Sequence, residues 1–476
     1  MITITGDSAI PVGESRPVHI TVLSSSGAPR PNQTVSMALP EGVAFFASTG
    51  TSAITGATDA TGVFATTMTI TRLTQASDGK AGPYEVTGTA GQVVATPAVF
   101  TTVLASGTVF RSSRGGTAAP VGSRTDITKV FPGNGNPYAL SATGVLYRLV
   151  NGDWQPVTGI PSGVYVVEAM ATPGGSGDVT SATGAWALLS DGRFAYIGTN
   201  STAVSRIVSP PVKPIGSWWG TGSTAGFNPA LGFAGEDGLF HVNIKDGSWN
   251  TFKSGNGGNT SGTAMGMSGE TSAYWFVGWT SDGSVYNWGE YSPLRARYVR
   301  SIPGVVDAIY GTDVVTALTD TGKAYVTRWD NTTGTNGVTE LKQAGGALLP
   351  GPVSTLRMVR GSSDDAIVFV IDGQVWGAQT DETSNYSNAK PAQSLPGGAH
   401  VVDLYASGSR GAGVGNVYVL ASDNAWYRAN RNPSNGTFDA WTPIGGLPAG
   451  GTLISIAVGQ NASGANSDGW AVVGTE

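Results

Sequence analysis

Few side chains of this 476-residue chain could perform acid–base or nucleophilic chemistry. It has three histidines, His19, His241 and His400, and no cysteine, which excludes thiol catalysis, disulfides and thiolate metal sites. His19 lies in an alternating segment, and His241 and His400 occupy repeat positions that other repeats fill with ordinary strand residues. No zinc-protease, nucleophile-elbow or phosphate-loop motif occurs. We therefore expect no catalytic residue and no cofactor.

Two pairs of neighbouring carboxylates, Glu236-Asp237 and Asp364-Asp365, have side chains that glycoside cleavage could use. Both pairs fall where a turn is expected, and an Asp before Gly usually serves the backbone of the turn. A calcium loop of D-x-D-x-D-G type is absent. We therefore expect no dedicated metal site, and a propeller hydrolase or lyase remains an alternative function.

A column of mostly polar residues recurs at the start of each repeat. It consists of Thr128, Glu168, Gly216, Asp307, Arg357, Asp403 and Ser455. If the first strand of each repeat lines a central channel, these residues form a ring that faces water. The ring is either a solvated wall or a place where an ion or ligand is held.

Aromatic residues are the other candidate site. Trp154, Trp249 and Trp441 recur on a last strand, and Trp288, Trp376 and Trp426 follow a hairpin turn, which predicts packing between repeats. The aromatic residues that fit the repeat less well are Trp218, Trp219, Trp279 and Tyr291. Aromatic faces stack on sugar rings, so these four are the candidate ligand-binding residues, with a core role as the alternative.

The elements that carry these residues are all predicted to be strands. Gly, Ser, Thr, Val and aromatic residues dominate, and only 12% of residues are charged. Residues 1–104 contain short alternating segments such as VHITVLS (18–24) and YEVTGTA (84–90), which predict a sandwich. Its turns Gly27-Ala28-Pro29 and Thr58-Asp59-Ala60-Thr61-Gly62 resemble those of bacterial immunoglobulin-like modules of invasin and intimin type. That resemblance implies an immunoglobulin-like spacer or stalk.

From residue 105 a hairpin recurs about every 47 residues, as in GWTSDGSVYNW (278–288) and ALTDTGKAYV (317–326). The residues predicted at its turns are Gly144, Gly192, Gly238, Gly283, Gly322, Gly373 and Asn424. Several strands per unit at this period predict a β-propeller over 105–476. The last segment, WAVVGTE (470–476), is half a hairpin, and SGTVFRSS (106–113) supplies the other half. Seven whole hairpins and one split hairpin predict eight blades, with seven as the alternative, and a closing blade shared between 106–123 and 452–476.

TSDGSVYNWG (280–289) resembles the repeats of the regulator-of-chromosome-condensation family. YRLVNGDWQPVTGIP (147–161) and WYRANRNPSNGTFDAWTPIGGLP (426–448) are equally similar to tectonin-type lectin repeats. Only the repeat matches, so the nucleotide-exchange activity of the first family does not carry over. Those families usually have six or seven blades, from which the predicted eight departs.

Charge and hydropathy argue against a nucleic-acid partner and against insertion into a membrane. The net charge is −6, and residues 1–104 hold 4 of the 26 basic and 6 of the 32 acidic residues, so neither part predicts a nucleic-acid partner. No run of 18 apolar residues predicts membrane insertion, and MITITGDSAIPVGES lacks the features of a signal peptide. We expect an extracellular, cell-surface or virion recognition protein whose propeller binds a glycan or a cell-surface protein through variable loops. The long, irregular insertions that predict these loops are 172–184, 199–214, 328–346 and 378–394. A receptor-binding or structural component of a phage tail is the alternative, and the sequence predicts no oligomeric state.

Overall fold

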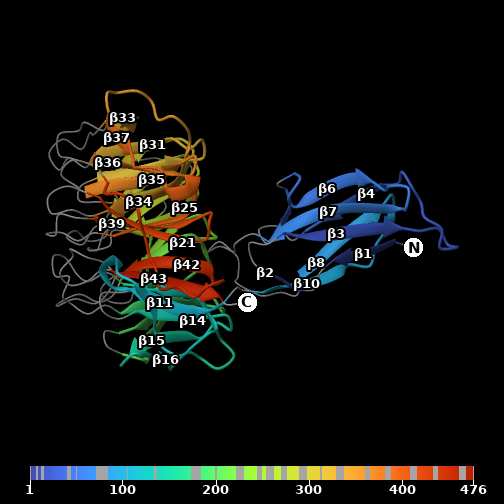
Figure 1. The fold of residues 1–476 in the computed structure, drawn as a ribbon, viewed down its shortest axis with the longest axis horizontal. Helices are drawn as coiled ribbons and strands as arrows, with labels where there is room; N and C mark the ends of the chain where they lie inside the picture. Colours follow the sequence, from blue (N-terminus) through green and yellow to red (C-terminus); the bar gives the residue numbers. More distant parts are fainter. Residues whose placement is uncertain are drawn as a thin grey trace. The chain divides into compact units, whose positions relative to one another are not determined.

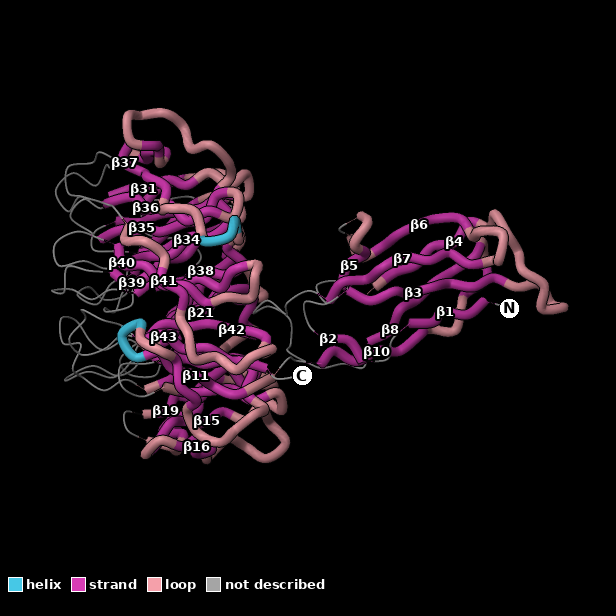
Figure 2. The backbone as a smooth tube through the Cα atoms, in the orientation of Figure 1, coloured by secondary structure: helices cyan, strands magenta, loops and turns pink. Residues whose placement is uncertain are grey.

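The computed structural model contains strands, turns and two single turns of 3₁₀ helix, Ser113–Gly115 and Pro396–Gly398. It describes residues 2–6, 9–11, 15–39, 44–49, 51–70, 84–103, 106–132, 137–172, 184–198, 201–220, 230–243, 249–252, 262–269, 276–288, 297–310, 314–328, 337–359, 365–380, 387–407, 415–431, 438–459 and 468–474. The chain divides into two compact units, Met1–Ala105 and Ser106–Glu476. The protein is all-β (Figures 1 and 2).

The first unit consists of two sheets. One has the order β1 (Ile2–Gly6), β3 (Ser15–Val22), β7 (Val63–Ile70) and β5 (Ala44–Phe46). The other has the order β2 (Ala9–Pro11), β10 (Ala98–Val103), β8 (Tyr84–Ala90), β4 (Thr34–Ala38) and β6 (Ala53–Ala57), with β9 (Val93–Val94) paired to β8. Alternate residues of both sheets, such as Ile20 and Met37, enter one shared core. The period-2 alternation in the sequence therefore corresponds to one buried and one exposed face.

The second unit contains eight sheets among its described residues. Sheet 1 consists of β13 (Ile127–Phe131), β14 (Tyr138–Ser141), β15 (Leu146–Val150) and β16 (Asp153–Pro156), and sheet 2 consists of β17 (Val166–Ala171), β18 (Ala185–Leu189), β19 (Phe194–Ile197) and β20 (Val204–Val208). Sheet 3 consists of β21 (Pro214–Gly220), β22 (Leu231–Gly235), β23 (Phe240–Asn243) and β24 (Trp249–Phe252). Sheet 4 consists of β25 (Ala264–Gly269), β26 (Phe276–Thr280), β27 (Ser284–Trp288) and β28 (Arg297–Ser301).

Sheets 5 to 7 continue the pattern, and sheet 8 is built from both ends of the unit. Sheet 5 consists of β29 (Val305–Tyr310), β30 (Val314–Thr319), β31 (Ala324–Arg328) and β32 (Val338–Glu340). Sheet 6 consists of β34 (Val353–Val359), β35 (Asp365–Ile371), β36 (Gln374–Thr380) and β37 (Ser387–Pro391), and β33 (Lys342–Gln343) pairs with β37. Sheet 7 consists of β38 (Val401–Ser407), β39 (Gly415–Ala421), β40 (Trp426–Arg431) and β41 (Thr442–Pro443), and sheet 8 of β42 (Thr452–Gly459), β43 (Asp468–Gly474), β11 (Thr108–Ser112) and β12 (Ala118–Pro120). Four-stranded antiparallel sheets that follow one another in this way are the arrangement of a β-propeller.

The hairpin turns lie at the residues that the repeat predicted. Gly144, Gly192, Gly238, Gly283, Gly322, Gly373 and Asn424 all have positive φ, between 60° and 84°. Glycine adopts this conformation without steric cost, and asparagine tolerates it better than most residues. The backbone oxygens of Gly144, Gly322 and Gly373 each accept a hydrogen bond from the first strand of the next sheet. These turns therefore also join neighbouring sheets.

The two ends of the unit meet in sheet 8. Strand β11 pairs antiparallel with β43, from Thr108 opposite Val473 to Ser112 opposite Gly469. Gly107 exchanges two backbone hydrogen bonds with Ile127, the first residue of sheet 1. Gly107 therefore occupies the place that a turn glycine has in the unbroken hairpins. This contact links the last sheet to the first one.

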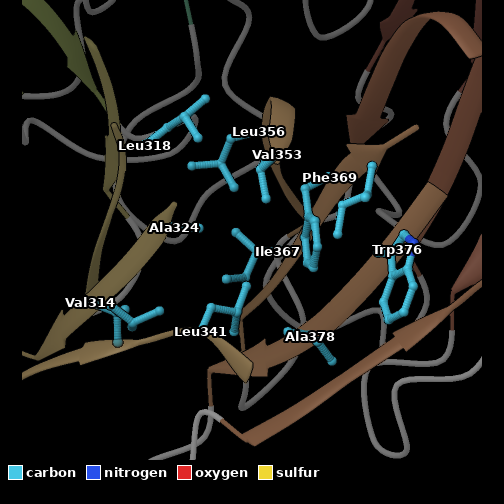
Figure 3. Close-up of a cluster of buried hydrophobic side chains, with 13 residues drawn as sticks. Val314, Leu318, Ala324, Leu341, Val353, Leu356, Ile367, Phe369, Trp376 and Ala378 are labelled. Atoms are coloured by element: carbon cyan, nitrogen blue, oxygen red, sulfur yellow. The ribbon is translucent and has the colours of Figure 1, made fainter. Parts of the chain in front are cut away.

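Apolar side chains fill the space between successive sheets. One cluster combines Val314 and Ala324 of sheet 5 with Leu356, Ile367 and Phe369 of sheet 6, and Figure 3 shows these side chains between the two sheets. Tryptophans in or directly before a fourth strand donate their indole N–H to the backbone that follows the previous sheet, as Trp154 does to Val121, Trp249 to Ser209 and Trp441 to Gln393. Their predicted role in packing between repeats is confirmed.

Candidate functional site at the first strands of the sheets

The first strand of every sheet in the second unit contains an irregularity at an equivalent position. The register shifts after Ile127, Val166, Ile215, Ala264, Val305, Val353, Val401 and Leu453. Such β-bulges insert an extra residue and redirect the side chains around it. First strands of neighbouring sheets also contact one another, as β13 with β42 and β34 with β38 do. These eight strands therefore form the inner part of the propeller.

The strand register shows that the predicted column of polar residues is partly wrong. Glu168, Asp307, Asp403 and Ser455 follow the extra residue and share one structural position. Thr128 and Gly216 are at or beside the bulge itself, and Arg357 comes two residues after the shared position. The seven residues therefore do not share one structural position and do not form one ring.

In several of the eight sheets, the extra residue of the bulge is apolar. Met265, Val306 and Val402 are 48%, 51% and 52% exposed, while Val167 and Ile454 are half-buried. Val167, Val306 and Val402 are followed by carboxylates that are less exposed than they are, namely Glu168 at 8%, Asp307 and Asp403. The inner strands thus expose apolar side chains and keep several polar side chains for contacts within the protein.

Glu168 contacts both neighbouring sheets. Its Oε2 accepts a hydrogen bond of 3.0 Å from the indole nitrogen of Trp218 in sheet 3. Its Oε1 lies 3.7 Å from the ammonium nitrogen of Lys129 in sheet 1. One carboxylate therefore links three successive sheets. This buried carboxylate is held by a hydrogen bond from one neighbouring sheet and an ion pair from the other.

A second polar link spans sheets 5, 6 and 7. Burial raises the pKa of the Asp307 carboxyl, and the positive charge of Arg357 opposes this rise. The Arg357 guanidinium lies 5.8 Å from the ring centre of Tyr405 and donates a hydrogen bond to the backbone oxygen of Leu356.

Ser455 links sheet 8 to sheet 1, since its hydroxyl donates a hydrogen bond to the backbone oxygen of Thr128 at 3.2 Å. Thr128 in turn donates to the Leu140 backbone.

The Arg357 charge leads to a pH-dependent prediction. Because the pKa of Asp307 is raised in the folded state, protonation of this carboxyl stabilises the fold at low pH. This contribution to the free energy of unfolding is lost as the pH rises through the folded-state pKa. Arg357→Met removes the opposing charge, so the pKa of Asp307 rises further. We expect the variant to lose about 1 kcal/mol more stability at pH 7 than at pH 3.5.

Calorimetry at the two pH values measures this difference. In the Asp307→Asn background the cost of Arg357→Met should no longer depend on pH. A cost of Arg357→Met that is equal at both pH values in the parent chain contradicts the coupling.

The predicted aromatic platform is wrong for two of its four residues. Trp218 is 3% exposed, and its ring packs edge-on against Phe194, with the two ring centres 5.3 Å apart. Trp279 is 4% exposed and packs in a cluster with Val277 and Ile302. Neither ring offers a face to a ligand. The backbone of Trp219 lies in β21, and its side chain is outside the described part of the structure, as is Tyr291.

One group with the residue types of catalysis was missed in the sequence. His241 is 1% exposed and stacks on Phe233. Its Nε2 lies 3.0 Å from Asp237 Oδ1, and its Nδ1 lies 3.1 Å from the Thr251 hydroxyl. Asp237 also accepts the backbone N–H of Leu239, as an aspartate in a turn does. Pairing of His241 with Thr251 across β23 and β24 could only be found once the register was known.

Glu236, the other half of this carboxylate pair, is exposed in the same turn, and its Oε1 lies 3.5 Å from the backbone nitrogen of Lys213. Asp364 lies outside the described residues, and Asp365 begins β35. No group of three or more potential metal ligands occurs among the described residues. No described helix is long and apolar enough to cross a bilayer.

The two ends of the sheets differ in their connections. Second and third strands are joined by short turns, the longest being 142–145 and its equivalents. The connections from one sheet to the next lie at this same end and also differ in length, as 302–304 and 253–263 do. First and second strands are joined at the opposite end by segments that range from 311–313 to 172–184. Third and fourth strands are joined at that same end, by segments such as 151–152, 329–337 and 432–441. We call this end of the second unit the variable face.

The predicted insertions can be placed on this pattern. Segment 172–184 joins the first and second strands of sheet 2. Segments 199–214, 328–346 and 378–394 each begin near the end of a third strand, but they also contain the fourth strands β20, β32 and β37. They are therefore partly regular structure rather than loops throughout.

Comparisons with known proteins leave the family open. No family model and no curated protein sequence matches the chain. Solved structures with similarity include BBS1N in complex with ARL6DN (12% identity, 65% of this chain and 91% of that chain, TM-score 0.37). Others are apo AztD from Citrobacter koseri (14%, 72% and 82%, 0.38) and Saccharomyces cerevisiae Sqt1 (10%, 74% and 96%, 0.42). At these scores they carry no argument about function.

Proposed function

We propose that this chain is a non-enzymatic recognition protein of a cell surface or virion. In this proposal, residues 1–104 form an immunoglobulin-like spacer. Residues 105–476 form a closed eight-bladed propeller that binds a glycan or a protein surface through its variable face.

The proposal of an immunoglobulin-like spacer rests on the two-sheet core and on its turns. Asp59 accepts hydrogen bonds from the backbone and hydroxyl of Thr61 and from the backbone of Val63. Gly62 adopts a φ of 76°, and its backbone oxygen accepts the N–H of Val22. The two turns that carry the resemblance are therefore joined through Val22, whose oxygen accepts the N–H of Arg30.

The proposal of eight blades rests on the eight sheets and on the contacts of sheet 8 with both neighbours. Sheet 8 packs apolar side chains against sheet 7, as Ile456 and Trp426 do, and against sheet 1, as Val472 and Val130 do. A closed ring removes the sheet edges that would otherwise pair with other chains. An experimental structure with seven blades contradicts this part of the proposal.

One observation carries the proposed function: among the connections within each sheet, variation in length is concentrated at the variable face. Connections at a sheet end tolerate change because the core does not depend on them. The sequences 172–184 (TPGGSGDVTSATG) and 460–467 (QNASGANS) are rich in Gly, Ser, Thr and Asn. Small hydrogen-bonding residues of this kind dominate the binding loops of antibodies.

The experiment that tests the function uses the full chain on arrays of bacterial and host glycans and on intact cells. We expect saturable binding to one class of glycan or surface protein. We also expect mass spectrometry of that ligand after prolonged incubation to show no change. Steady cleavage that a single carboxylate substitution abolishes indicates a hydrolase or lyase. Binding only to other copies of the chain indicates a structural component.

A further inference from the structure

Three side chains of sheet 3 form a hydrogen-bonded row that ends at the protein surface. His241 Nε2 lies 3.0 Å from Oδ1 and 3.1 Å from Oδ2 of Asp237, and His241 Nδ1 lies 3.1 Å from the Thr251 hydroxyl. His241 and Thr251 are register partners on β23 and β24, so their side chains leave the same face of the sheet. The imidazole is buried, whereas Thr251 is exposed. The hydroxyl is therefore the accessible end of this row.

The Asp237 carboxylate fixes the direction of both hydrogen bonds. Burial raises the pKa of this carboxyl, but the hydrogen bonds from His241 and from the backbone of Leu239 lower it, and the net pKa lies below the ordinary value. An ionised carboxylate can only accept, so His241 Nε2 carries the proton that it donates. In the neutral imidazole Nδ1 is then the acceptor, and the Thr251 hydroxyl donates to it. A hydroxyl, its base and a group that orients the base are the parts of an activated nucleophile.

The imidazole is held in a fixed orientation. Its ring stacks on Phe233, with the ring centres 5.1 Å apart and 21° between the ring planes. A Cβ added to Gly235 would come within 2.8 Å of His241 Cδ2 and 2.6 Å of Asp237 Oδ1, so glycine at 235 leaves room for the pair. A general base has to stay within hydrogen-bond reach of the proton that it takes. The packing of His241 meets this requirement.

The surroundings of Thr251 suit an acyl group. Trp249 lies two residues earlier on β24, hence on the same face of the strand, and it is half-buried. In the part of the chain that the structure describes, no strand pairs with the outer edge of β24. Every second residue of such an edge directs its backbone N–H away from the sheet. These N–H groups can donate to the oxygen of a reacting carbonyl.

We propose that Thr251 is a nucleophile that accepts an acyl group from an ester, with His241 as general base and Asp237 as the positioning residue. The Thr251 oxygen bonds to the carbonyl carbon of the ester while its proton passes to His241 Nδ1. The bond from this carbon to the leaving oxygen then breaks, and the proton passes from Nδ1 to that oxygen. The products are a Thr251 ester and the free alcohol.

The test treats the full chain with p-nitrophenyl acetate at pH 8, where histidine is ordinarily neutral, and locates acetyl groups by peptide mass spectrometry. We expect Thr251 to be acetylated at least about 100-fold faster than other exposed threonines. His241→Gln and Asp237→Asn should each slow this acetylation by about 100-fold or more. Thr61→Val is the matched control, since the exposed Thr61 hydroxyl donates directly to Asp59 rather than to a histidine. Its Thr251 should react like that of the parent.

Nitrogen NMR of the chain with isotope-labelled histidine reports the tautomer of His241, which a merely structural row would not need to fix. We expect the proton on Nε2 in the parent and on Nδ1 in Asp237→Asn, because the introduced amide can donate to Nε2.

The proposal is overturned if Thr251 of the parent is acetylated no faster than other exposed threonines, or if His241→Gln leaves its rate unchanged. It is also overturned if Nδ1 of His241 carries the proton in the parent at pH 8. The first and the last of these outcomes need only the parent chain, so they can be read even if a variant folds poorly.

Discussion

Deletion of residues 468–476 is expected to abolish the cooperative unfolding transition of the Ser106–Glu476 unit. The deletion removes β43, which pairs with β11 on one side and with β42 on the other. It also removes Trp470, Ala471, Val472 and Val473, all at most 4% exposed. Two strands lose their partners and two neighbouring cores open, so the cost should exceed the 5–15 kcal/mol that holds a typical domain together.

Calorimetry and gel filtration of the truncated chain measure this effect. We expect aggregation or a broad transition of the second unit. Truncation after Gly474 is the matched control and should melt like the parent. A soluble 1–467 chain that keeps a cooperative transition near the parent temperature shows that β43 does not close the ring.

Trp218→Ala is expected to destabilise the second unit by about 3–5 kcal/mol. The indole is buried against Phe194, and its N–H donates to the buried carboxylate of Glu168. Truncation therefore leaves a cavity and removes one partner of a buried charge. Trp218→Phe keeps most of the apolar contact and should cost less, so the difference between the two variants separates packing from the hydrogen bond.

Chemical denaturation of the two variants measures both costs. An unchanged unfolding midpoint for Trp218→Ala, together with weaker ligand binding, restores the interpretation of Trp218 as a ligand platform.

Features that depend on local backbone conformation could be predicted from the sequence. The turn residues from Gly144 to Asn424 were found because a two-strand hairpin needs positive φ at one fixed point. The pairing of β11 with β43 was found because the two end segments complete one repeat. Both inferences compare a local pattern that recurs from one repeat to the next.

Features that depend on register could not be predicted. The shared position of each first strand is defined by its pairing with the second strand. Thr128, one residue before that position, and Arg357, two residues after it, were therefore wrongly aligned with Glu168. Burial of Trp218 and Trp279 follows from contacts between elements distant in the sequence. The contact of His241 with Thr251 was missed because it depends on the register of β23 and β24.

The most direct test of the proposed recognition head compares binding by variants altered at opposite ends of the sheets. In one variant, 173–183 and 460–467 are each replaced by a two-residue Asn-Gly connection. In the control variant, the turns Thr143-Gly144 and Asp191-Gly192 are replaced by Asn-Gly. For the ligand found on the arrays, we predict that the first variant loses at least tenfold in affinity at an unchanged melting temperature, while the control binds like the parent. Equal affinity of all three chains contradicts recognition through the variable face.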